Sequence, residues 1–192
     1  MPSGRRSVVD LGAGTGNVTA ALLAAGHTVT AVENNQGMLD RLRSKCLSGR
    51  PLTVVKSSIE NLTILAEESF DAAVMVNALY AVDDPLACLQ SVHRIVKPNG
   101  VLALSTTHSG TELDTLLNSI KARLVEAGQY NELSGDYQIL YDVNKQIEKV
   151  IAKRHTRDEY REWIRAAGFE IIKDVPSTYE DAVMLIHAMR KR

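Results

Sequence analysis

The sequence predicts a doubly wound α/β fold: a mostly parallel, seven-stranded sheet with helices on both faces and an antiparallel last strand. Short apolar runs alternate with helical patterns along residues 7–106, which favours right-handed crossovers between parallel strands. A glycine-rich turn follows the first run. Phe70–Val76 is continuously apolar, as expected of a parallel strand that is covered on both faces.

The first half of the chain supplies three strands and two helices. Ser7–Leu11 is an apolar run that ends at the glycine turn. Thr15–Ala25 then has helical spacing, and Gly26 ends it. The next elements are a β-branched strand, a helix and a third strand, at Thr28–Val32, about Gln36–Lys45 and Leu52–Lys56.

After the fourth strand, Phe70–Val76, the residues Asp83-Asp84-Pro85 open a helix that runs to about Val96. Proline fits the first helical position, and the helix dipole favours acidic side chains at this end of a helix. Asn99-Gly100 predicts a turn into a fifth strand at Val101–Thr106.

The pattern changes after the fifth strand. Residues 109–153 give two long helical patterns with no strand between them, which we interpret as an inserted helical lid. Thr156 and Glu159 form a capping box for a helix that ends near Gly168. Two final strands follow at Phe169–Val175 and Ala182–Met189, and their short connection predicts antiparallel pairing.

Length and composition predict one domain over residues 1–192. A chain of 192 residues with 45% hydrophobic content can bury one substantial core. The 22 basic and 23 acidic residues leave a net charge of −1, so we expect a small-molecule substrate and no nucleic-acid partner. The expected assembly is a monomer or a homodimer.

Cysteine usage and hydropathy predict a cytoplasmic protein. Cys46 and Cys88 have no metal-like spacing and suggest free thiols in a reducing compartment. The five histidines are also not at metal spacing, so no metal site is expected. Neither a signal peptide nor a membrane span is apparent.

The glycine turn, Asp10-Leu-Gly-Ala-Gly-Thr-Gly16, indicates a ligand site. Glycines between a strand and a helix let a ligand approach the backbone and expose amide groups to it. A dinucleotide site requires Gly-x-Gly-x-x-Gly, but here the glycines are spaced by two and Asn17 stands at the third position. An NAD-dependent enzyme is therefore the weakest alternative.

Two acidic residues flank this turn and narrow the ligand. Asp10 precedes the glycines, where a carboxylate would repel a pyrophosphate but pair with an ammonium group. Glu33 ends the second strand, where a carboxylate can accept hydrogen bonds from ribose hydroxyls. Taken singly, Asp10 is also compatible with a loop cap and Glu33 with a solvated strand end.

Four ordered motifs resemble those of class I S-adenosylmethionine (AdoMet)-dependent methyltransferases. The resemblance covers roughly residues 7–107, whereas residues 109–153 match nothing we can name. The motifs are Val8-Val-Asp-Leu-Gly-Ala-Gly-Thr-Gly16, Ala31-Val-Glu33, Phe70-Asp-Ala-Ala-Val-Met-Val-Asn77 and Ile95-Val-Lys-Pro-Asn-Gly-Val-Leu102.

The resemblance implies AdoMet as the cofactor, S-adenosylhomocysteine as its product, and a set of binding residues. Asp10 and the loop would hold the methionine end, Glu33 the ribose, and Met38 the adenine. The family usually has Asp where this chain has Ser58, and usually has a helical segment before the first strand. The implied cofactor residues are Asp10, Gly12, Ala13, Gly14, Gly16, Asn17, Glu33, Asn34, Met38, Ser58, Ile59, Asn77 and Ala78.

Candidates for the transfer step follow the fourth and fifth strands. Asn77-Ala-Leu-Tyr80 occupies the position of the Asn-Pro-Pro-Tyr motif of enzymes that methylate exocyclic amines, but lacks its prolines. Tyr80 is a candidate to face the acceptor, or a core aromatic. His108 has a pKa suited to a general base, or is a solvated loop residue. Both are assigned as tentative catalytic and substrate residues.

The helical insertion contains further aromatic candidates. Tyr130, Tyr137 and Tyr141 account for half of the six tyrosines. Rings with polar tips suit a small, partly apolar acceptor, and equally suit packing between lid helices. Tyr137 and Tyr141 are kept as tentative substrate residues.

The leading hypothesis is thus a methyltransferase that transfers a methyl group to an oxygen, nitrogen or carbon of a small molecule. Alignment of the acceptor is its main task, with or without a general base. The alternatives are a protein or RNA methyltransferase, and a non-catalytic module that binds AdoMet or S-adenosylhomocysteine.

Overall fold

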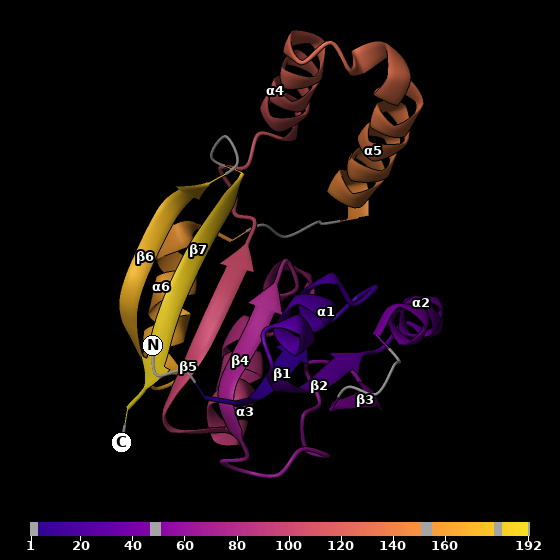
Figure 1. The fold of residues 1–192 in the computed structure, drawn as a ribbon. Coiled ribbons are helices and arrows are strands. Elements are labelled where there is room, and N and C mark those ends of the chain that lie inside the picture. The colour runs from indigo at the N-terminus through magenta and orange to yellow at the C-terminus, as the bar shows by residue number, and fades with distance from the viewer. Residues whose placement is uncertain (1–3, 47–50, 151–154, 179–181, 192) are drawn as a thin grey trace.

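The computed structural model describes residues 4–46, 51–150, 155–178 and 182–191, and shows one sheet with helices on both faces (Figure 1). The strand order is β3-β2-β1-β4-β5-β7-β6. The strands are β1 Ser7–Leu11, β2 Thr28–Glu33, β3 Leu52–Lys56, β4 Phe70–Val76, β5 Val96–Thr106, β6 Phe169–Thr178 and β7 Val183–Arg190. The helices are α1 Asn17–Ala24, α2 Gln36–Cys46, η1 Leu79–Ala81, α3 Pro85–Ile95, α4 Leu113–Glu126, α5 Tyr130–Val150 and α6 Arg157–Ala166.

The predicted sheet is confirmed. Strands β1 to β5 pair in parallel, and β7 pairs antiparallel with both β5 and β6. The chain order reverses between β1 and β4, so the loops after these two strands diverge. In open α/β sheets, ligands bind at this switch point, outside the carboxyl ends of the strands.

One predicted boundary is wrong: the fifth strand begins at Val96, not at Val101, and helix α3 ends at Ile95. Val96 already pairs with Phe70, and a bulge then carries the chain to the pair Val101 and Ala72. Asn99 adopts a left-handed φ of 63° in this bulge. A Cβ on Gly100 would lie 2.6 Å from Val96 Cγ1, so only glycine fits there.

The main core lies between the sheet and helices α3 and α6. Helix α3 buries Cys88, Leu89, Val92 and Ile95, which recur on one helical face. Burial raises the pKa of the Cys88 thiol to about 12, which fits an inert core residue. The side chain of Cys46 lies outside the described residues.

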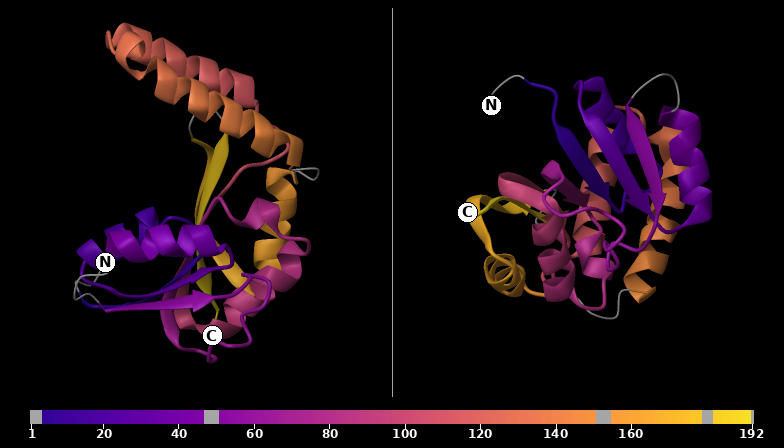
Figure 2. Two further views of the ribbon diagram at one scale, coloured as in Figure 1. Left: turned by 90° about the vertical axis from the view of Figure 1, so that its right-hand side faces the viewer. Right: turned by 90° about the horizontal axis from the view of Figure 1, so that it is seen from below.

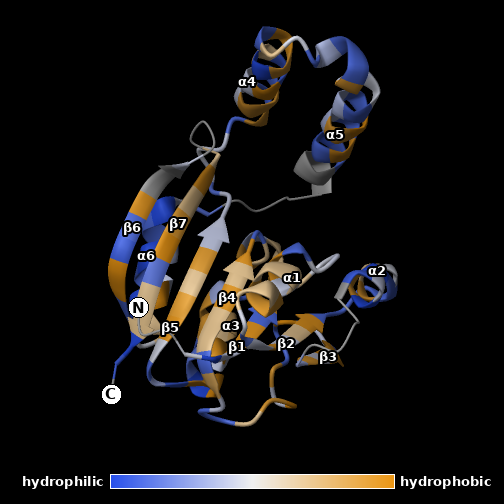
Figure 3. Ribbon diagram, viewed as in Figure 1, coloured by the Kyte–Doolittle hydropathy of each residue, from blue (hydrophilic) through white to orange (hydrophobic). Residues whose placement is uncertain are grey.

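The opposite face of the sheet is covered unevenly. Helices α1 and α2 lie in front of β1, β2 and β3, whereas no helix in the described ranges lies in front of β4, β5, β7 and β6 (Figure 1, Figure 2). The hydropathy view shows that these strands carry apolar residues (Figure 3).

The two helices predicted within residues 109–153 are present as α4 and α5, and residues 151–154 lie outside the described ranges. They form a hairpin that projects from the sheet (Figure 2). The two helices pack on each other, and neither packs extensively on another element. The capping box of α6 is confirmed: Thr156 and Glu159 exchange both hydrogen bonds.

Candidate functional site

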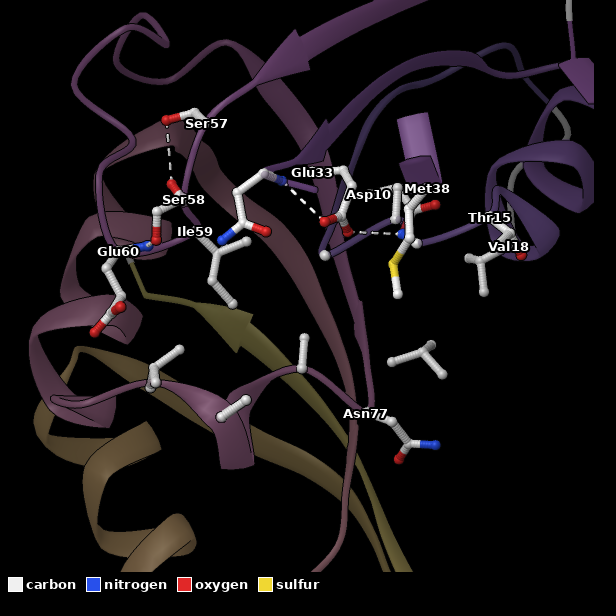
Figure 4. Close-up of a pocket in the computed structure, with 18 of the residues that line it drawn as sticks. Asp10, Thr15, Val18, Glu33, Met38, Ser57, Ser58, Ile59, Glu60 and Asn77 are labelled. Atoms are coloured by element: carbon white, nitrogen blue, oxygen red, sulfur yellow. Dashed lines mark hydrogen bonds between the residues drawn. The ribbon is translucent and has the colours of Figure 1, made fainter. Parts of the chain in front are cut away.

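A cavity of about 460 Å³ lies at the carboxyl ends of β1, β2 and β4 (Figure 4). Its volume is within the range of small-molecule and cofactor sites. All the cofactor residues expected from the sequence line it except Gly16, which is buried at the start of α1. The cavity also exposes residues that were not predicted: Thr15, Val18, Ser57, Glu60, Val76, Ala81 and Val82.

The glycine loop is fixed by its backbone geometry. Gly12 and Gly14 have φ values of 71° and 55°, in the left-handed region that favours glycine. The amides of Gly12 and Ala13 donate to the carbonyl of Val32, at 2.9 and 3.0 Å. A Cβ on Gly12 would lie only 2.7 Å from Ala78 Cβ. The loop therefore sits close between the ends of β2 and β4.

Asp10 lies at the base of this loop with 1% of its surface exposed. The hydroxyl of Thr19, on α1, donates to its carboxylate at 2.6 Å. Burial raises the pKa of Asp10, the charge of Glu33 adds to this, and the hydrogen bonds from Thr19 oppose it. A cation bound in the cavity would stabilise the ionised form of this carboxylate, in place of the water that burial removes.

The carboxylate of Glu33 accepts hydrogen bonds from two loops, the glycine loop and the loop after β2. One carboxylate oxygen accepts from Gly14 N at 3.0 Å, and the other accepts from Asn34 N at 2.9 Å (Figure 4). The second oxygen also accepts from Asn35 N at 2.8 Å. The residue is only 8% exposed, which excludes a solvated strand end. Each oxygen has two acceptor sites, so the oxygen bound to Gly14 can accept one more hydrogen bond.

The wall after β3 combines apolar and polar groups. Ile59 is partly buried, and the Ser58 hydroxyl accepts from Glu60 N at 3.2 Å. Glu60 also lines the cavity (Figure 4), and its carboxylate accepts from Asp83 N at 2.9 Å. The sequence signal that could have indicated Glu60 is its position as the first acidic residue after Ser58, where the family usually has Asp.

The end of β4 brings a polar side chain to the cavity. Asn77 has a left-handed φ of 49°, and its amide donates to the carbonyl of Ser105 at 2.9 Å. Tyr80 follows in η1 but does not line the cavity. It is partly buried, and burial raises the pKa of its phenol.

His108 is not the solvated loop residue of the alternative interpretation, since it is 1% exposed and does not line the cavity. Its Nδ1 accepts from Gly110 N at 3.1 Å, and its own amide donates to Thr111 Oγ1. Thr111 in turn donates to the carbonyl of Ala182. These hydrogen bonds connect the segment that follows β5 to Ala182, which precedes β7. A general-base role stays a prediction that needs this turn to open.

The insertion's three tyrosines form a cluster of rings on α5, and Tyr137 contacts α4. Tyr137 is buried, and its hydroxyl donates to the carbonyl of Leu117 at 3.2 Å. The ring centres of Tyr130 and Tyr141 lie 5.9 and 6.4 Å from that of Tyr137. None of the three lines the cavity, so a substrate role for Tyr137 and Tyr141 stays a prediction.

Comparison with known proteins identifies the class. A family model described as "Methyltransferase domain" matches residues 9–104. The chain is 33% identical over 106 residues to the ubiquinone biosynthesis O-methyltransferase of Actinobacillus pleuropneumoniae, covering 53% of this chain and 45% of that protein. It is 25% identical over 178 residues to the demethylmenaquinone methyltransferase of Clavibacter sepedonicus, covering 90% and 69%.

Structural comparison agrees on the fold. An S-adenosylmethionine-dependent methyltransferase from Mesorhizobium loti superposes with a TM-score of 0.72 at 19% identity, covering 99% of this chain and 94% of that one. The chain therefore belongs to the methyltransferase-domain family, with the fold of class I AdoMet-dependent methyltransferases. It spans about half the length of the first curated relatives it matches.

Two features are absent from the residues that the structure describes. No helix among them is long and apolar enough to cross a membrane. No group of His, Cys, Asp and Glu side chains within the same ranges is arranged to hold a metal ion.

Proposed function

We propose that this chain binds AdoMet in the cavity at the ends of β1, β2 and β4 and transfers its methyl group to a small molecule. One observation carries the proposal: a buried, poorly solvated carboxylate, Asp10, lines a cavity that lies beside a glycine loop. This combination suits a ligand with both a cationic and a polar end. S-adenosylhomocysteine would be the product.

The cavity's chemistry fits the parts of AdoMet one by one. Asp10 would pair with the ammonium group, and Glu33 would accept a ribose hydroxyl on its remaining acceptor site. Met38 and Ile59 offer apolar surface to the adenine. Glu60 would accept from the adenine's amino group, replacing the acid that the family usually has at position 58.

Bound AdoMet would supply an electrophilic methyl group, so the protein's own task is to align the acceptor and exclude water. Asn77 and Ala78 lie where the cavity meets the ends of β4 and β5. Tyr80 is the nearest phenol in sequence to this point. Its raised pKa keeps it protonated at neutral pH, so it would act as a hydrogen-bond donor to the acceptor.

A small aromatic acceptor is the proposed substrate class. The two curated relatives carry names from ubiquinone and menaquinone methylation, which supports a quinol-like acceptor for this chain as well. The net charge of −1 supports a small molecule over RNA, because nucleic-acid binding rests on basic surfaces.

A non-catalytic AdoMet-binding module is the second candidate. The supporting observation is that neither tentative catalytic residue, His108 nor Tyr80, lines the cavity. In this alternative the chain binds the cofactor and transfers nothing.

The two candidates are separated by incubating the protein with AdoMet labelled in its methyl group. The acceptors are a hydroxylated naphthoquinol, a catechol, cellular RNA and total cell protein. Methyl transfer to a small phenolic acceptor supports the enzyme, and the variant Asp10→Asn should strongly reduce this transfer at AdoMet concentrations that saturate the wild type. Saturable AdoMet binding without transfer to any acceptor supports the binding module. Label in RNA or protein overturns the proposed substrate class.

A further inference from the structure

The charged side chains that line the cavity are all acidic. They are Asp10, Glu33 and Glu60, and no lysine, arginine or histidine of the described ranges lines it. AdoMet carries an ammonium and a sulfonium group, which these carboxylates attract, and also a carboxylate, which they repel. A cavity that binds AdoMet therefore needs donors, and preferably a cation, for the ligand's own carboxylate.

A basic side chain reaches the cavity through one of the residues that line it. Lys45 lies in the last turn of α2, and its Nζ donates to Oδ1 of Asn17 at 2.6 Å. Asn17 is the first residue of α1 and lines the cavity, whereas Lys45 does not. The two residues are 28 positions apart. The contact thus joins α2 to the start of α1 at the edge of the cavity.

The hydrogen bond from Lys45 determines how the Asn17 amide is turned. A lysine ammonium group only donates, so it binds the carbonyl oxygen of the amide. The NH2 group of Asn17 makes no hydrogen bond to the described residues and keeps two donors for a ligand. The positive charge beside the oxygen also polarises the amide, which strengthens these donors. Lys45 therefore prepares Asn17 to bind an anion.

The position of Asn17 relative to Asp10 suits the two charged groups of an amino acid. The ammonium and the carboxylate of AdoMet are attached to one carbon atom, so their binding sites must be neighbours. Asp10, the proposed partner of the ammonium, accepts from Thr19, which follows Asn17 by two residues on α1. The first turn of α1 has no acidic side chain, and its positive dipole end favours an anion.

We propose that Lys45 is a positioning residue that makes the cavity selective for the carboxylate of AdoMet, by orienting the amide of Asn17. This inference rests on the proposed function, because it concerns the same cavity and the same cofactor. Asn17 would donate to the carboxylate directly, and Lys45 would act through Asn17 and through its charge. Without Lys45, the ligand's carboxylate would meet the acidic cavity with no cation beside it.

The test compares AdoMet with decarboxylated AdoMet, which keeps the ammonium, the sulfonium and the adenosine but lacks the carboxylate. Isothermal titration calorimetry measures both affinities for the wild type and for Lys45→Met. The variant should bind AdoMet about fivefold more weakly, as expected for one charge that acts at the protein surface. Its affinity for the decarboxylated ligand should not fall. A purely structural role of Lys45 would weaken both ligands alike.

Two further variants examine the mechanism. Asn17→Asp still accepts from Lys45 but replaces the NH2 group with a second oxygen, so AdoMet affinity should fall by about tenfold or more and affinity for the decarboxylated ligand should not. Lys45→Arg keeps the charge and the donors, so it should keep most of the preference for the carboxylate. Lys45 and Asn17 are exposed, so each variant should keep its fold, as circular dichroism will verify.

A matched control is Lys56→Met. Lys56 donates to Oε1 of Gln36 at 2.9 Å, which is the same kind of lysine–amide pair, but neither residue lines the cavity. This variant should bind both ligands like the wild type.

The outcomes separate this proposal from the proposed function. If the wild type binds AdoMet, the proposal alone is overturned by any of three results: unchanged AdoMet affinity in Lys45→Met, equal losses for the two ligands, or the same loss in Lys56→Met. A wild type that binds neither ligand overturns the proposed function together with this inference.

Discussion

The cavity region and the α4–α5 hairpin are stabilised by separate sets of hydrogen bonds. Around the cavity, Asp10 and Glu33 bind hydroxyl and amide groups from other segments of the chain, namely α1, the glycine loop and the loop after β2. In the hairpin, Tyr137 bonds to the neighbouring helix. The cavity is therefore built by the sheet, while the hairpin is a separate unit whose changes should leave the cavity intact.

The sharpest test of this contrast is the variant Asp10→Asn. The amide oxygen can still accept from Thr19, but the negative charge that would pair with the ammonium is removed. We expect AdoMet affinity to fall by about 100-fold, as for loss of a charge-assisted bond of about 3 kcal/mol. Isothermal titration calorimetry measures this, with the exposed Asp40→Asn as the matched control. Equal affinity in the two variants would refute the site assignment.

The next test addresses the close approach of the glycine loop to β4. Gly12→Ala adds a Cβ that would lie 2.7 Å from Ala78 Cβ, at a φ of 71° that alanine disfavours. We expect the free energy of unfolding in urea to fall by about 2 kcal/mol. The double variant Gly12→Ala, Ala78→Gly should recover the part caused by the contact but not the part caused by φ. No recovery at all would assign the whole cost to the backbone.

Acidification should weaken cofactor binding earlier than for an ordinary aspartate. The pKa of Asp10 is raised by burial, so the carboxylate takes up a proton at a pH above its usual value of 3.8. Below that raised pKa, affinity should fall by about tenfold for each pH unit, because the proton must leave before the ammonium binds. The expected loss should be absent in Asp10→Asn, and calorimetry across a pH series measures it.

The same shift has the opposite sign for the stability of the unliganded protein. A folded-state pKa above the unfolded value means that the proton favours folding below the unfolded pKa, and that this stabilisation is lost as pH rises through the folded pKa. At neutral pH the buried charge of Asp10 is thus a cost. Asp10→Asn should therefore raise the free energy of unfolding at neutral pH while it weakens binding, and a loss of both would contradict this reasoning.

The sequence predicted the cavity region far better than the rest of the site. Strands β1, β3 and β4 begin and end where their apolar runs do, since each run is bounded by a glycine or a polar turn. His108 and Tyr137 could not be placed in this way. Their surroundings depend on contacts with Ala182 and Leu117, which are distant in sequence and carry no local signal. Tertiary packing decided those positions.

The smallest expected effect lies in the hairpin, at Tyr137→Phe. The change removes the hydroxyl that donates to Leu117 and keeps the ring between Tyr130 and Tyr141. We expect hydrogen exchange in α4 and α5 to speed up in line with a loss of about 1 kcal/mol, and exchange in β1 and β4 to stay unchanged. AdoMet affinity should not change either, because Tyr137 does not line the cavity. If methyl transfer fell sharply while hairpin exchange stayed the same, the phenol would act on the acceptor, and the hairpin would be part of the site after all.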